Sequence, residues 1–112
     1  MTLEELLGNA IETFNKKAAT DPKLRGEVEG KVRRVFIELT DTEGYNFVLE
    51  NSRVGGLRKG RVPDPDIHIT TDSATLEALM KKEMGPMKAL VTKKLRLTKI
   101  SMEDLGTIRK FF

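Results

Sequence analysis

The sequence contains no cysteine, and its longest apolar runs are short. The lack of cysteine excludes disulfide bonds, zinc sites with thiolate ligands and cysteine nucleophiles, and it is typical of proteins in a reducing compartment. No apolar run approaches the ~20 residues that a transmembrane helix needs. The N-terminal segment carries acidic residues and lacks the apolar core of a signal peptide. We therefore expect a cytoplasmic protein.

Residues suited to catalysis or metal binding are also scarce. His68 is the only histidine, and a lone histidine without cysteine or a paired carboxylate favours a structural or surface role. Asp64 and Asp66 flank Pro65 and fit a turn better than a cation site. The segment 55–60 is rich in glycine but lacks the GxxxxGK[ST] spacing of a phosphate-binding loop. We predict no catalytic residues, no metal site and no cofactor, and hence no enzyme.

Aromatic residues are few, and positive charge is concentrated in one part of the chain. Residues 1–72 hold 11 basic and 13 acidic side chains, whereas residues 73–112 hold 9 basic and 4 acidic ones. The basic part is typical either of a solvated lysine-rich surface or of contact with anionic lipid head groups or nucleic acid. None of the six Phe and Tyr residues is interleaved with the lysines of 81–99. Stacking platforms are therefore lacking, and we predict no nucleic-acid binding.

The N-terminal segment predicts a long amphipathic helix. Thr2 and Glu5 match the capping-box pattern that begins a helix. Apolar residues then recur at helical spacing, namely Leu3, Leu6, Leu7, Ala10, Ile11 and Phe14. Asp21-Pro22 ends the helix, and residues 23–28 fit a further short helical turn.

The next segment predicts a hairpin followed by a weaker strand. Residues 30–40 and 45–50 alternate between apolar and polar and flank a turn at 41–44. In the first strand Val35, Ile37 and Leu39 point to one face, and Arg34, Phe36 and Glu38 to the other. Residues 53–59 contain Gly55-Gly56, which offers little side chain to pack, so we expect this strand at an edge of the sheet or beneath something bulky.

The stretch 66–99 predicts a strand, two short helices and a second strand. Ile67 and Ile69 alternate in the first strand, Gly85-Pro86 separates the helices, and residues 95–97 form the second strand. The residues expected inside are Leu76, Leu79 and Met80 in the first helix and Met87, Leu90 and Val91 in the second.

A final helix begins near Ser101 and carries a buried stripe of Leu105, Ile108 and Phe112, with Phe111 beside it. Two adjacent aromatic residues predict that this helix docks on an apolar surface. The order of elements predicts one domain, residues 1–112. Its architecture is two-layer α+β, with a five-stranded, mainly antiparallel sheet and helices on one face.

Methionine is concentrated on the two short helices, at Met80, Met84 and Met87. Methionine is flexible and polarizable, so it adapts to irregular apolar shapes. For each residue alone, ordinary core packing explains its presence. Three within eight residues, beside the break at Gly85-Pro86, also fit a deformable ligand cavity.

The residues of this stretch resemble the signature of the lipid-transfer domain of the sterol carrier protein family. The matching segments are Ala78-Leu79-Met80, Met84, Pro86, Ala89-Leu90-Val91 and Lys94-Leu95-Arg96-Leu97-Thr98. The resemblance implies the α+β fold expected above, with an apolar cavity between sheet and helices that binds a fatty acyl chain, a sterol or another hydrophobic ligand such as an isoprenoid.

The resemblance also implies where a ligand would bind. The cavity would be lined by Phe47, Leu49, Leu79, Met80, Met84, Met87, Leu90 and Val91, with Ile108, Phe111 and Phe112 in a lid. Lys82, Lys93 and Lys94 are candidates for contact with an anionic head group or membrane surface.

Positions 82, 93 and 99, where the family often has glycine, are lysines here. Because glycine supplies a positive φ or close backbone approach, we expect those turns to differ.

Two functions stay open at this point. The first is a non-catalytic lipid carrier, monomeric or weakly dimeric. The second is a protein-interaction or oligomerisation module that uses the same apolar groove. An exposed Phe111-Phe112 pair would favour the second.

Overall fold

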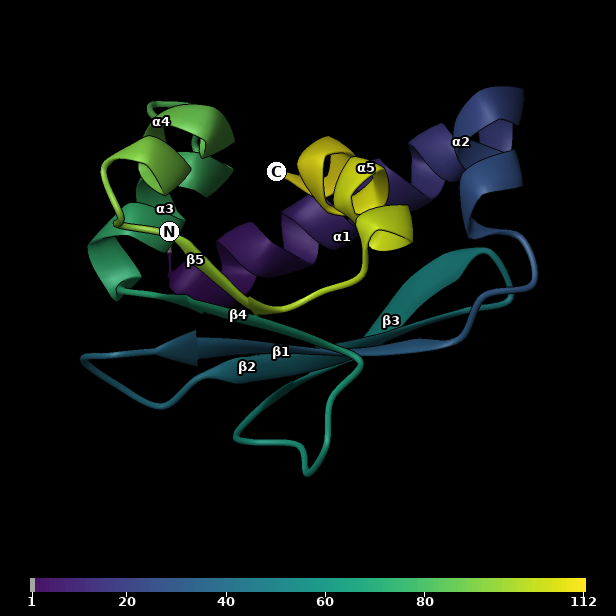
Figure 1. Cartoon of the computed structure of the whole chain (residues 1–112). Coiled ribbons are helices and arrows are strands. Elements are labelled where there is room, and N and C mark those ends of the chain that lie inside the picture. The colour runs from purple at the N-terminus through teal and green to yellow at the C-terminus, as the bar shows by residue number, and fades with distance from the viewer. Residues whose placement is uncertain (1) are drawn as a thin grey trace.

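The structure, a computed structural model that describes residues 2–112, has helices on one face of a five-stranded sheet (Figure 1). The predicted order of elements is confirmed. The helices are α1 (Leu3–Thr20), α2 (Pro22–Val28), α3 (Ser73–Met80), α4 (Pro86–Val91) and α5 (Met102–Phe111). The strands are β1 (Arg33–Leu39), β2 (Tyr45–Glu50), β3 (Arg53–Lys59), β4 (Ile67–Thr71) and β5 (Arg96–Lys99).

Helix α1 begins at the predicted capping box. Thr2 Oγ1 accepts a hydrogen bond from the Glu5 amide, and Glu5 Oε1 accepts one from the Thr2 amide, both at 3.1 Å. Asp21 ends α1 and caps α2, because its Oδ1 accepts from the Lys23 amide at 3.0 Å. Among the described residues, no helix combines the length and apolar character needed to cross a bilayer.

The strands lie in the order β3-β2-β1-β4-β5. Neighbouring strands are antiparallel except β1 and β4, which are parallel. The weak strand β3 lies at an edge, as expected. The predicted α+β class with a mainly antiparallel sheet is confirmed.

The alternation of β1 assigns its faces correctly but underestimates the burial of Phe36. Phe36 lies on the face without helices, yet only 4% of it is exposed. The ring of His68 lies 5.1 Å away, and the Arg61 guanidinium lies 5.6 Å from the ring centroid. Gly44 also approaches closely, since a Cβ there would come within 2.9 Å of Phe36 Cε1. Polar neighbours and a glycine therefore cover this ring without a helix.

Helix α4 differs from the expectation that Met87, Leu90 and Val91 point inside. Ala89 is fully buried and Leu90 half-buried, whereas Met87 is 55% and Val91 77% exposed. The prediction was wrong for Met87 and Val91. A helix of six residues makes fewer than two turns, so only a narrow face can pack on the rest of the chain.

The turns on either side of α4 keep a left-handed backbone. Lys82 and Lys93 both have φ of 62°, and Lys99 lies within β5. The expectation of different turns was therefore wrong at 82 and 93, where lysine adopts the conformation that glycine favours. After Lys93, the Leu95 amide donates to the Ala89 carbonyl at 3.0 Å. Strand β5 consequently begins at Arg96, one residue later than predicted.

Candidate functional site

Three phenylalanines meet beneath α5, between this helix and the sheet. The ring centroid of Phe111 lies 5.9 Å from that of Phe14 in α1 and 5.3 Å from that of Phe47 in β2. Phe112 packs edge-on against Phe111 at 5.5 Å. Both terminal aromatics are buried, which confirms that this helix docks on an apolar surface. Their burial does not favour the interaction module.

The space between sheet and α5 is almost entirely filled. About 20 Å³ stays open there, lined in part by four predicted cavity residues, Phe47, Leu49, Ile108 and Phe111. The sequence predicts an apolar space between sheet and helices and leaves open whether the protein fills it; here the Phe111 ring occupies most of it. Thr107 also lines this space, and its buried hydroxyl has no hydrogen-bond partner among residues 2–112.

An open apolar groove lies on the other side of α5, between this helix, α4 and β5. Its volume is about 310 Å³. Four of the predicted residues line it, namely Met87, Leu90, Ile108 and Phe112. The other apolar side chains along it are Pro86, Leu95, Leu97 and Leu105. The groove thus joins residues from three elements that are not continuous in the sequence.

Among residues 2–112, Arg109 is the one residue with a charged side chain that lines this groove, and sequence reasoning missed it. Leu105, Arg109 and Phe112 are spaced four and three residues apart, so they share one face of α5. That spacing was a usable signal, but it says nothing about which neighbours the face meets. In the described part of the chain, the Arg109 side chain has no ion-pair or hydrogen-bond partner, and it is free to meet a polar group.

A second hollow of about 280 Å³ lies between α1, α3 and α5. Met80, Lys82 and Phe111 contribute to it, together with Lys110. Lys82 Nζ donates to the backbone oxygen of Phe112, and Lys110 pairs with Glu27 of α2 at 3.1 Å. These contacts tie the C-terminal end of α5 to the neighbouring helices.

The other predicted site residues lie outside these three spaces. Leu79 is fully buried in the core, and Met84 is half-buried against it. Val91, Lys93 and Lys94 are exposed at the end of α4 and in the turn that follows.

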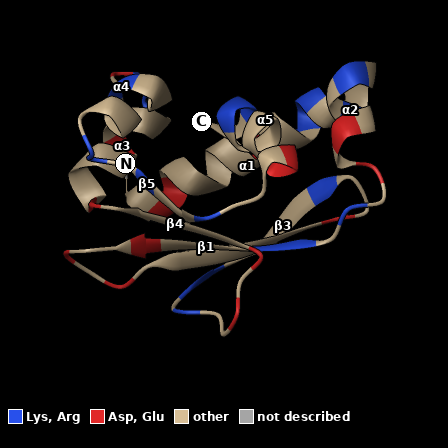
Figure 2. Cartoon of the chain, viewed as in Figure 1, with Lys and Arg blue, Asp and Glu red and all other residues tan. Residues whose placement is uncertain are grey.

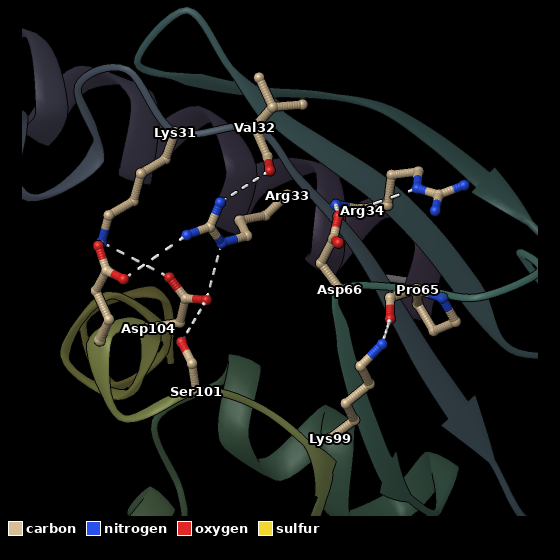
Figure 3. Close-up of polar contacts among 10 residues, drawn as sticks. Lys31, Val32, Arg33, Arg34, Pro65, Asp66, Lys99, Ser101 and Asp104 are labelled. Carbon is tan, nitrogen blue, oxygen red and sulfur yellow. Dashed lines mark hydrogen bonds and ion pairs between the residues drawn. The ribbon is translucent and has the colours of Figure 1, made fainter.

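The N-terminal end of α5 is held by ionic contacts to the segment around β1 (Figure 3). Asp104 Oδ2 accepts from Arg33 Nε and from Ser101 Oγ, each at 2.9 Å, and Lys31 Nζ lies 3.7 Å from Asp104 Oδ1. Burial alone would raise the pKa of Asp104. The hydrogen bonds from Arg33 and Ser101, with the charges of Arg33 and Lys31, outweigh burial and lower it. The same hydrogen bond to Asp104 favours the charged form of Arg33 and so raises the pKa of Arg33.

His68 lies on the sheet face without helices, away from the groove. Its Nε2 is 2.9 Å from Glu38 Oε1, and its ring contacts Phe36. Within residues 2–112, no three His, Asp or Glu side chains are grouped so that they could hold a metal ion.

Solved structures share this fold. Sterol carrier protein 2 is 17% identical, with a TM-score of 0.61, and the match covers 92% of this chain and 87% of that one. Palmitated SCP2L2 from Aedes aegypti is 20% identical, with a TM-score of 0.55 and coverage of 90% and 87%. The sec-alkylsulfatase Pisa1 from Pseudomonas sp. is 17% identical, with a TM-score of 0.60 over 77% of this chain. This chain spans only 13% of that enzyme.

Sequence comparison identifies the family directly. A search of curated proteins found no match. The sequence model described as the SCP-2 sterol transfer family matches residues 10–103, which is most of the chain, including α3, α4 and β5. The predicted resemblance is therefore confirmed: the chain belongs to the SCP-2 sterol transfer family, a family of lipid-binding and lipid-transfer domains.

Proposed function

We propose that this chain is a lipid carrier that holds the apolar part of its ligand in the groove between α4, β5 and α5. The observation that carries the proposal is the groove itself. It is open, its lining is apolar apart from Arg109, and its volume is about 310 Å³. That volume lies at the lower end of the ~300–1,000 Å³ typical of small-molecule sites.

Burial of an acyl chain in this groove supplies the binding free energy. Each buried CH₂ contributes about 0.8 kcal/mol. A dozen methylenes would contribute roughly 10 kcal/mol before the costs of association and ordering, which consume much of it. Micromolar affinity therefore requires no specific polar contact. The fold is shared with the palmitated SCP2L2, which supports an acyl chain as a ligand.

Arg109 offers a place for the polar end of the ligand. In the described part of the chain, Arg109 is the one charged side chain along the groove, and an unpaired guanidinium matches the planar geometry of a carboxylate. Lys93 and Lys94, candidates for this role from the sequence, do not line the groove.

We also propose that the carrier has no catalytic activity of its own. The single histidine is paired with Glu38 on the opposite face of the sheet from the groove. The same fold occurs within an alkylsulfatase, so a carrier of this kind is compatible with service to an enzyme. The single domain, the cytoplasmic location, the monomeric or weakly dimeric state and the lack of nucleic-acid binding stay predictions.

A substitution that fills the groove tests the proposal. Leu105 lies half-buried in the groove, and Met102, on the same helix, is 84% exposed and outside it. We expect Leu105→Trp to weaken uptake of a fluorescent fatty acid at least tenfold, because the indole occupies the ligand's place. Met102→Trp is the matched control and should bind as the wild type does. Equal uptake by both variants would place the ligand elsewhere and overturn the proposal.

A further inference from the structure

Helix α4 presents an apolar surface to solvent. Met87 and Val91 are one helical turn apart and are 55% and 77% exposed. Within the described residues, only Val32 and Met102 are large hydrophobic residues of comparable exposure. Met87 also lines the groove, so the exposed surface of α4 is continuous with the groove.

Cations without partners surround this surface. Residues 81–99 contain seven Lys and Arg side chains and one acidic residue, Glu83. Figure 2 shows basic residues on α4 and on the segment that leads to β5. In the part of the chain that the structure describes, four of these cations have no ion-pair or hydrogen-bond partner for their side chains, namely Lys88, Lys93, Lys94 and Arg96. By contrast, Lys81 pairs with Glu77 at 2.8 Å.

The exposed pair Val32 and Met102 has a different electrostatic setting. The neighbouring Lys31 lies 3.4 Å from Glu103, and Arg33 bonds to Asp104. Charge near this second apolar pair is therefore neutralised within the chain. The two pairs are similar in exposure but not in charge, which makes the second a natural control.

The backbone gives independent support. Lys82 and Lys93 flank α4 and both have φ of 62°, a conformation that costs free energy for any residue with a Cβ and none for glycine. Strained residues that persist in a fold point to a function for their side chains. The Lys82 side chain donates a hydrogen bond to the backbone oxygen of Phe112. The Lys93 side chain has no hydrogen-bond or ion-pair partner within the described chain.

We propose that α4 and the lysines beside it form a docking surface for an anionic lipid bilayer. Met87 and Val91 would enter the interface, and Lys88, Lys93 and Lys94 would lie at the level of the lipid phosphates. A second copy of the chain is a poor occupant, because it would bring the same unpaired cations together. The inference extends the proposed function, since docking in this way turns the groove toward the bilayer.

The chain contains no tryptophan, so a single introduced tryptophan reports on its own site. We compare Val91→Trp with Met102→Trp on phosphatidylcholine vesicles with and without phosphatidylserine. At position 91 we expect a blue shift, and quenching by brominated acyl chains, only when phosphatidylserine is present. Position 102 should show neither. No shift at 91, or the same shift at both positions, would overturn the proposal.

Co-sedimentation with the same phosphatidylserine vesicles tests how much the lysine charges contribute to vesicle binding. A lysine near an anionic surface contributes about fivefold to binding, so Lys93→Gln/Lys94→Gln should bind roughly 25-fold more weakly. Lys16→Gln/Lys17→Gln is the matched control, because it removes two consecutive exposed lysines of α1. An equal loss in both double variants would indicate general charge attraction and contradict a specific surface. Binding to an acidic protein or an RNA, without binding to the vesicles, would also contradict it.

Uptake of the fluorescent fatty acid without vesicles separates this inference from the proposed function. Val91, Lys93 and Lys94 do not line the groove, so their variants should take up the probe as the wild type does. If the probe fails to bind while the vesicle results hold, the carrier proposal falls and the docking surface stands. Normal uptake of the probe without vesicle binding would overturn the docking surface and leave the carrier proposal in place.

Discussion

At the scale of single residues, Lys93 shares with Lys82 a conformation that is unusual for lysine. It ends the turn after α4 with a left-handed backbone, and its amide donates to the Leu90 carbonyl at 3.1 Å. The next amide, that of Lys94, donates to the Ala89 carbonyl at 2.9 Å. This second bond closes the helix end and requires the positive φ at Lys93, which glycine adopts without a steric cost. Lysine at this position therefore lowers stability while it adds charge.

Replacing Lys93 should raise stability and weaken membrane contact together. We expect Lys93→Gly to increase the free energy of unfolding by about 0.5–1 kcal/mol, because the left-handed strain exceeds the extra entropy of an unfolded glycine. Binding to anionic vesicles should fall about fivefold. Urea denaturation measures the first effect. Lys94→Gly, at a position without positive φ, is the control and should be neutral or destabilising. A loss of stability in both variants would contradict the argument.

At the scale of elements, helix α5 is fastened at both ends. Asp104 and its partners hold the N-terminal end, and the Lys82 and Lys110 contacts hold the C-terminal end. At the C-terminal end, Phe111 fills the space above the sheet, and Phe112 lines the groove. The position of α5 therefore decides which apolar space is open.

The Asp104 contact makes the stability of α5 depend on pH. Its pKa is lowered in the folded chain, so the carboxylate contributes stability above its unfolded pKa of about 3.9 and loses it as pH falls through the lower folded value. We expect Asp104→Asn to cost roughly 2–3 kcal/mol at pH 7, because Arg33 loses the charge of the partner to which it is hydrogen-bonded.

Urea denaturation of Asp104→Asn and of the wild type, at pH 7 and at about pH 2, measures how the difference in their free energies of unfolding depends on pH. The difference between the two proteins should shrink below about pH 4, since protonation then removes the charge from the wild type as well. A difference that stays constant down to about pH 2 would show that the carboxylate charge is not what holds α5.

At the scale of the whole molecule, a ligand in the groove links three elements that otherwise meet along an open surface. A ligand that binds only the folded chain at a hundred times its Kd stabilises by about 2.7 kcal/mol. For a chain of this size we expect palmitate to raise Tm by about 10 °C. Differential scanning calorimetry measures the shift, and Leu105→Trp should show a much smaller one. An unchanged Tm for the wild type at saturating palmitate would argue against a carrier.

The sequence alone determined the elements, their order and the family. Capping residues such as Thr2 and Asp21 and the alternation of Val35 and Ile37 act over a few residues, so local spacing reveals them. The basic character of 81–99 was equally visible. The residues of 66–99 that carry the family signature were sufficient to identify the fold.

Only the tertiary structure decided which apolar space is open and which side of α4 meets water. Periodicity shows that residues share a face, but whether that face is covered depends on elements far away in the sequence. Phe111 closes the expected cavity because Phe14 and Phe47 meet it there. Arg109 joins the groove because α5 lies beside α4 and β5. These are contacts between distant segments, and no local pattern encodes them.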